Sequence, residues 1–189
     1  MKKQLLATIL AICLFGVMAH GQQAGSASDL ILKSYSARTF TSQPVSAGDL
    51  EIILKCGIKA PSARNLQPWK FIVARDFSLM QQMIGNSVTQ GNVLIVVCGP
   101  EAQANSTVDF DCGLATENMT IAAQSLGLGA RIYTGPVANI NSTMKQTLQI
   151  PAGWRAVAVL RVGHIDKNVD AVSAASPRNS YNEVVTFLK

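Results

Sequence analysis

The chain has 189 residues, of which 48% are apolar, and it carries 16 lysines and arginines against 11 aspartates and glutamates. A chain of this length and composition is typical of one domain with a sizeable core, so two domains are not expected. The basic residues are scattered along the sequence rather than clustered, which predicts a solvated surface and no nucleic-acid partner.

The amino-terminal segment has the three parts of a secretory signal. Lys2 and Lys3 precede an apolar run that ends near Ala19, and Ala19-His20-Gly21 is a small-x-small cleavage pattern. The apolar run is shorter than the roughly 20 residues that a membrane-spanning helix needs, although an uncleaved membrane anchor is the alternative. We therefore predict a signal peptide over residues 1–21, export to the periplasm, and no membrane association after cleavage.

The segment after the signal is small and polar over residues 22–28, which predicts a flexible lead before one folded domain at residues 29–189. Beyond the signal the cysteines are Cys56, Cys98 and Cys112. They are odd in number and lack CxxC spacing, so the sequence predicts neither a disulfide framework nor a zinc site.

The predicted elements begin with a short helix over residues 30–34 and a longer one from Ala47 to about Ala60. Ser46 and Asp49 have the spacing of a helix cap, and Pro61 stops this helix. Further predicted elements are strands at 69–74, 93–98, 130–133 and 156–162, and helices at 108–126 and 140–148. Strands and helices do not alternate regularly, which indicates an α+β protein rather than a doubly wound sheet.

Two of these segments carry additional signals. The run 93–98 is continuously apolar, which predicts a strand buried on both faces. The helix at 108–126 is rich in small residues, which favours close packing against a sheet or a partner subunit. Gly127 and Gly129 follow a helix rather than a strand, so they are predicted to end that helix instead of forming a dinucleotide-binding fingerprint.

The segment APSARNLQPWKFIV, residues 60–73, is the strongest local signal for a site. Its polar side chains, Ser62, Arg64, Asn65 and Gln67, are predicted on a loop between a helix and a strand. Polar side chains held between two rigid elements are well placed to contact a ligand. The alternative is an ordinary connection built from turn-forming residues.

The PS-x-x-N-x-QPW-x-F pattern in this loop resembles the signature loop of the nitroreductase family. Further stretches match the same family in the same order, so the resemblance covers nearly everything from Leu30 onward. The stretch SYSARTF at 34–40 resembles RRSxRxF, and residues 111–130 resemble a long core helix ending in GLG. Residues 149–163 resemble an IPxG turn and strand, and SPRNS at 176–180 resembles a basic element near the carboxyl terminus.

The resemblance implies an FMN site and no metal. The phosphate would be held by the forked guanidinium donors of Arg38 and Arg178 together with Ser36. Ser34 stands where the family has a basic residue, with Lys33 immediately before it, so this phosphate contact departs from the pattern. The cofactor-binding residues implied are Ser34, Ser36, Arg38, Pro61, Ser62, Asn65, Gln67, Thr134, Gly135 and Arg178.

The remaining roles concern the flavin ring. The amide of Asn65 can both donate to and accept from the pyrimidine edge, and Gln67 either does the same or braces the loop. Arg64 or Lys70 is a candidate for the positive charge near that edge. The implied chemistry needs no catalytic acid or base from the chain, because the cofactor carries the hydride.

The resemblance further implies a mostly antiparallel sheet flanked by helices, in a homodimer that exchanges elements between its subunits. Its implied activity is ping-pong transfer of hydride from NAD(P)H to a small acceptor such as a nitroaromatic or a quinone. Export would separate the protein from cytoplasmic NAD(P)H. Two alternatives therefore stay open: an exported FMN carrier with little turnover, and a flavin enzyme of different chemistry on the same fold.

Overall fold

The computed structural model describes residues 26–101, 106–169 and 177–188. The contacts divide the chain into two units, residues 1–32 and 33–189. The predicted signal peptide and residues 22–25 of the predicted lead lie outside the described residues. Within the described ranges, no helix has both the length and the apolar character that crossing a membrane requires.

All but the last residue of α2 (Ala27–Lys33) lies in the first unit. Its start is fixed by a reciprocal cap, because the Asp29 amide donates to Ser26 Oγ at 3.2 Å and the Ser26 amide donates to Asp29 Oδ2 at 3.1 Å. The helix therefore begins three residues before the predicted start at Leu30 and takes in Ala27 and Ser28, the end of the predicted lead.

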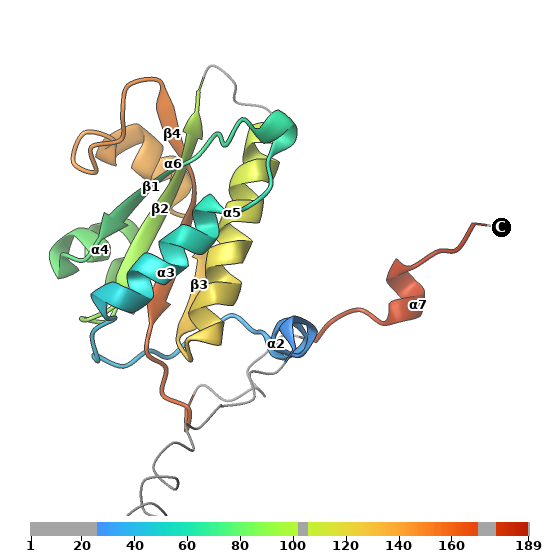
Figure 1. Cartoon of the computed structure of the whole chain (residues 1–189). Coiled ribbons are helices and arrows are strands. Elements are labelled where there is room, and N and C mark those ends of the chain that lie inside the picture. Colours follow the sequence, from blue (N-terminus) through green and yellow to red (C-terminus); the bar gives the residue numbers. More distant parts are fainter. Residues whose placement is uncertain (1–25, 102–105, 170–176, 189) are drawn as a thin grey trace, which may run out of the picture. The chain divides into compact units, whose positions relative to one another are not determined.

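The second unit is built around one antiparallel sheet with the strand order β1-β2-β4-β3 (Figure 1). Its strands are β1 (Lys70–Ala74), β2 (Val93–Pro100), β3 (Gly129–Tyr133) and β4 (Trp154–Gly163). The central pair β2 and β4 runs in register from Val93 opposite Val162 to Pro100 opposite Trp154, with one irregularity after Val97. The predicted α+β class with a mostly antiparallel sheet is confirmed.

Helices cover both faces of this sheet, and successive side chains of β2 point alternately into the core on one face and the core on the other. Val93, Ile95 and Val97 pack with α3 (Ala47–Ile58) and α5 (Ser106–Ser125). Leu94, Val96 and Cys98 pack with α4 (Phe77–Ile84) and with the segment made of α6 (Val137–Asn139) and η3 (Ile140–Met144). The prediction of a strand buried on both faces is confirmed, since residues 93–99 are all buried. The described elements also include η1 (Ala63–Asn65), η2 (Gly85–Ser87) and α7 (Tyr181–Val184).

Local signals located α3 accurately. The Asp49 amide donates to Ser46 Oγ at 3.0 Å, which confirms the predicted cap. The sequence reading missed α4, whose amino-terminal cap is made by Asp76 accepting from the Leu79 amide at 2.7 Å.

The predicted helix at 140–148 is wrong in type, because α6 passes into a π-helical turn at Ile140–Met144. Asn141 binds both backbone groups of Ala156 on β4, at 2.7 and 3.0 Å. This tertiary contact holds the turn against the sheet, and π turns of this kind occur mostly as single local distortions.

Two of the cysteines are packed in the core, and this sets their reactivity. Burial is the main cause that raises the pKa of Cys98 and of Cys112 to about 12, while Cys56 is only half-buried. At pH 8 a thiol with such a pKa is ionised to only about one part in ten thousand, and the thiolate is the reactive form.

We therefore expect iodoacetamide at pH 8 to alkylate Cys56 in the folded protein and to leave Cys98 and Cys112 unmodified, as read by peptide mass spectrometry. In urea all three should react. Because both buried thiols keep their protons in the folded state, the free energy of unfolding should fall as the pH rises from about 9 towards 12. Rapid alkylation of Cys98 in the folded state would contradict this account.

Candidate functional site

A small polar cavity is lined by residues from near both ends of the second unit. It has a volume of about 140 Å³ and is lined by residues from four parts of the chain. They are Ser34, Tyr35, Ser36, Glu117, Thr120, Gln124, Ala130, Ile132 and Arg178. The structure thus brings Arg178 to the predicted hydroxyl side chains Ser34 and Ser36, although they are far apart in the sequence.

The loop at 34–40 is held against the sheet by its backbone. The Ala37 amide donates to the Ala130 carbonyl at 3.1 Å, and Gln124 Nε2 donates to the Tyr35 carbonyl at 3.0 Å. Ala37 is buried, whereas Ser36 and Arg38 on either side of it are exposed. Arg38 does not line the small cavity.

The cavity fits the phosphate end of FMN. Two hydroxyl side chains and a guanidinium are donors of the kind that bind phosphate oxygens. Its volume suits a phosphate but is too small for the flavin ring system, which would have to lie outside it. Glu117 places a carboxylate in the same lining, which opposes an anion at that side. Among the described residues of this lining, Arg178 is the one basic side chain, so no second cation replaces the basic residue that the family has at position 34.

The loop at 61–69 lies outside that cavity and has an unusual backbone. Arg64, Asn65 and Gln67 have φ of 52°, 56° and 49°, in the left-handed region. For residues other than glycine such a backbone costs roughly 1 kcal/mol or more each, and it is found mostly where surrounding contacts enforce it, often at ligand sites.

The contacts that enforce it are local and tertiary. The Gln67 amide donates to Ser62 Oγ at 2.9 Å. The Ala63 amide donates to both carboxylate oxygens of Asp111 on α5, at 3.1 and 3.2 Å. Asp111 is buried, and sequence reasoning missed its role because it lies 48 residues along the chain from Ala63.

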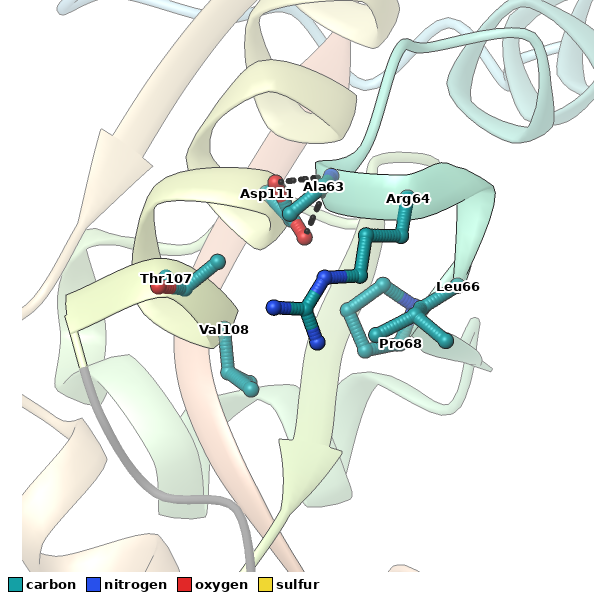
Figure 2. Close-up of a pocket in the computed structure, with 7 residues that line it drawn as sticks. All are labelled: Ala63, Arg64, Leu66, Pro68, Thr107, Val108 and Asp111. Atoms are coloured by element: carbon teal, nitrogen blue, oxygen red, sulfur yellow. Dashed lines mark hydrogen bonds between the residues drawn. The ribbon is translucent and has the colours of Figure 1, made fainter.

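Two cavities flank this loop. One has a volume of about 470 Å³ and is lined by Ala63, Arg64, Leu66, Pro68, Thr107, Val108 and Asp111 (Figure 2). The other, of about 480 Å³, is lined by Leu54, Ile58, Gln67, Trp69, Lys70 and Phe71. Gln67 is thus at a cavity wall, while Pro61, Ser62 and Asn65 do not line any of these three cavities.

The last two predicted residues, Thr134 and Gly135, follow β3 and are exposed. A Cβ placed on Gly135 would meet no atom within 4 Å among the described residues, so open space surrounds it. These residues are neighbours along the chain of Ile132, which lines the small cavity. Their role at the flavin stays a prediction.

Sequence reasoning also missed Glu117, Thr120 and Gln124 as lining residues of the small cavity. Their spacing of three and four residues places them on one face of α5. Polar residues at this spacing on a helix rich in small residues were the signal that could have found them.

Comparisons with known proteins agree with this geometry. The model of the nitroreductase family matches residues 31–90 and 79–164. A protein of Archaeoglobus fulgidus with the provisional name NADH dehydrogenase/NAD(P)H nitroreductase is 32% identical over 145 residues, covering 71% of this chain and 83% of its own.

An NADPH-flavin oxidoreductase of Vibrio harveyi is 26% identical, covering 74% of this chain and 66% of its own. A solved structure from Desulfovibrio desulfuricans, provisionally named a nitroreductase and in complex with FMN, has a TM-score of 0.75 and 29% identity, covering 87% of this chain and 98% of its own. The family model matches more than half of the chain, and the chain has the signature loop and the antiparallel sheet. The chain therefore belongs to the nitroreductase family.

Proposed function

We propose that this chain is an FMN-dependent NAD(P)H oxidoreductase that reduces a small acceptor such as a nitroaromatic or a quinone. The observation that carries the proposal is the small cavity, where Ser34, Ser36 and Arg178 present phosphate donors. The FMN complex from Desulfovibrio desulfuricans and the flavin oxidoreductase of Vibrio harveyi support the same cofactor and reductant.

In this proposal FMN supplies the hydride chemistry, and the chain supplies binding, orientation and control of water. Arg178 and the two serines hold the phosphate, and Arg38 extends the positive charge beside it. Asn65 binds the pyrimidine edge of the ring. No side chain needs to move a proton for hydride to pass from the nicotinamide donor to the acceptor.

We also propose that the active form is a homodimer in which each flavin is bound between two chains. None of the residues that line the phosphate cavity belongs to the loop at 61–69. This separation supports a flavin site in which one chain binds the phosphate and the partner chain supplies its loop. Large apolar side chains near the carboxyl terminus are exposed in the single chain, as expected for a segment that a partner covers. They are Tyr181, Val184, Phe187 and Leu188.

The signal-like segment at residues 1–21 leads us to propose export, most simply to the periplasm. The same segment favours the second candidate function, an exported FMN carrier, because NAD(P)H is a cytoplasmic reductant. The two candidates differ in what happens when the reductant is added.

The function is tested by adding NADPH or NADH to the purified, FMN-loaded protein under anaerobic conditions. We expect the flavin absorbance near 450 nm to bleach and to return when a nitroaromatic acceptor is added, because ping-pong exchange uses one site for both. Full retention of oxidised flavin with both donors would support the carrier instead. A protein that stays colourless with excess FMN would exclude both.

The phosphate assignment is tested by Arg178→Gln, which removes the guanidinium and keeps a polar side chain. We expect its FMN dissociation constant to rise at least tenfold, since hydrogen bonds to charged groups contribute about 1.5–3 kcal/mol. Riboflavin lacks the phosphate, so its affinity should change by less than about twofold if only that contact is lost. Equal losses for both ligands would show that Arg178 acts on the fold rather than on the phosphate.

A further inference from the structure

The cavity beside the signature loop is lined by the exposed cation Arg64 together with apolar and polar side chains. The guanidinium of Arg64 extends along the cavity of about 470 Å³ towards Thr107 and Val108, with Pro68 on its other side (Figure 2). The Asp111 carboxylate lies at the end of the cavity next to Ala63. Across the ranges that the structure describes, neither an ion pair nor a hydrogen bond is recorded for the Arg64 guanidinium.

The backbone that carries this side chain is anchored on both sides of Arg64. Arg64 has φ 52° and ψ 22°, and the two residues that anchor the loop around it are Ala63, bound to Asp111, and Gln67, bound to Ser62. A cation held on an anchored loop loses less conformational freedom when it binds a ligand than one on a flexible loop. A guanidinium that lines a cavity without a direct ion pair therefore favours an anion on the side away from Asp111.

We propose that Arg64 binds an oxyanion of the substrate, so that this site prefers substrates carrying a carboxylate or a phosphate over neutral ones. The proposal rests on the proposed function and adds the chemical class of its substrate. A guanidinium binds carboxylate and phosphate oxygens through two parallel hydrogen bonds. Leu66, Pro68 and Val108 add apolar surface to the same lining, against which the carbon skeleton of a substrate can pack.

The same geometry determines where the anion lies. Asp111 is buried with both oxygens turned to the Ala63 amide, so its charge repels an anion from that end of the cavity. The anion is therefore expected on the Thr107 and Val108 side of the guanidinium. Two sources supply such a group: an acceptor that bears a carboxylate, and the 2′-phosphate that distinguishes NADPH from NADH.

The main test compares the FMN-loaded protein with its Arg64→Asn variant. Asparagine removes the charge and tolerates the left-handed backbone, so the loop should keep its conformation. In the acceptor arm, the ratio of kcat/KM for 4-nitrobenzoate over 4-nitrobenzamide should fall about tenfold, the effect of one lost charge-assisted contact. In the donor arm, the ratio for NADPH over NADH would fall instead if the anion is the 2′-phosphate.

A second measurement needs no turnover. Titration of the protein with 4-fluorobenzoate or 4-fluorobenzamide, followed by fluorine NMR, reports binding of the anion and of its neutral counterpart. Arg64→Asn should lose the preference for the benzoate. Asp111→Asn should raise that preference several-fold, because the amide oxygen can still accept from Ala63 while the repelling charge is gone. Lys59→Gln removes an exposed charge outside the cavity lining and should leave the preference unchanged.

A selective fall in the acceptor ratio or in the donor ratio would support the proposal and identify the source of the anion. Unchanged ratios in both arms, with a protein that NAD(P)H still bleaches, would overturn it and leave the proposed function standing. A change in FMN affinity or in the dimer dissociation constant, with no change in either ratio, would also overturn it. A protein that binds no FMN would instead refute the function itself.

Discussion

Gly129→Ala is expected to weaken FMN binding about tenfold and to lower the free energy of unfolding by about 2 kcal/mol, a typical effect of overpacking a core position. A Cβ at residue 129 would lie 2.2 Å from Ile165 Cγ2 and 2.8 Å from Ala37 Cβ. Rotation of the Ile165 side chain can relieve only the first contact, because the Cβ of Ala37 moves only with its own backbone. The added methyl group must therefore push the loop at 34–40 outward.

This displacement reaches the proposed phosphate donors directly. Ala37 is the buried residue between Ser36 and Arg38, and its amide holds the loop on Ala130. Moving Ala37 moves both neighbours relative to Arg178. FMN affinity is measured by quenching of flavin fluorescence, and stability by urea unfolding monitored by circular dichroism.

Gly113→Ala is the matched control. It adds the same methyl group to α5, where no described atom outside the adjoining helix backbone and chain neighbours lies within 4 Å of the new Cβ. Alanine is the better helix former, so stability should rise by up to about 1 kcal/mol, and FMN affinity should not change. If Gly129→Ala lowered stability and left FMN affinity unaltered, the loop at 34–40 would have no part in holding the cofactor.

Arg161→Met is expected to lower the free energy of unfolding by about 3 kcal/mol, because it removes three hydrogen bonds at once, one to the buried Asn92 and two to part-buried acceptors. Arg161 lies on β4 and is 1% exposed. Its Nε donates to Asn92 Oδ1 at 2.8 Å, Nη1 to the Ser87 carbonyl at 2.6 Å, and Nη2 to Thr89 Oγ1 at 3.0 Å.

These partners are all neutral, which makes the site sensitive to the loss of donors rather than to the loss of an ion pair. The guanidinium also stacks 3.9 Å from the centre of the Phe40 ring, a favourable contact for a cation. Burial lowers the pKa of Arg161, the sign expected when a charged group is taken out of water. Methionine fills much of the same volume but offers no donor.

Arg155→Met on the same strand provides the comparison. Arg155 pairs with a half-exposed Asp109 near the surface, and such pairs contribute at most about 1 kcal/mol. Urea unfolding of both variants should therefore separate them by about 2 kcal/mol. Equal effects would mean that apolar packing by methionine at position 161 offsets the lost hydrogen bonds, as apolar residues often do when they replace buried charged groups.

The elements that the sequence predicted well depend on neighbours along the chain. Ser46 and Asp49 form the cap of α3 within one turn of helix. Gly127, with φ of 77°, ends α5 where the glycine pattern placed the end. The continuous apolar run of β2 predicted burial on both faces because its composition allows no solvated face.

The site residues were predicted as types and only partly as an arrangement. The family motifs identified Ser34, Ser36 and Arg178, and the structure places these three in one cavity. The loop residues Asn65 and Gln67 were also identified, but their left-handed backbone was not. That conformation depends on Asp111, whose carboxylate is brought to Ala63 only when α5 packs beside the loop.

The sequence by itself determined the four strands, the helices α3 and α5, the family and the chemical types at the site, because these follow from local spacing and from residue identity. Only the tertiary structure decided that Arg161 is buried while Arg64 stands in a cavity. Arg161 stands between two apolar residues in the sequence and Arg64 stands between Ala63 and Asn65, and neither setting shows which guanidinium acquires acceptors. Their difference arises from Ser87, Thr89 and Asn92, which surround one guanidinium with acceptors, whereas the anchored loop turns the other towards open space.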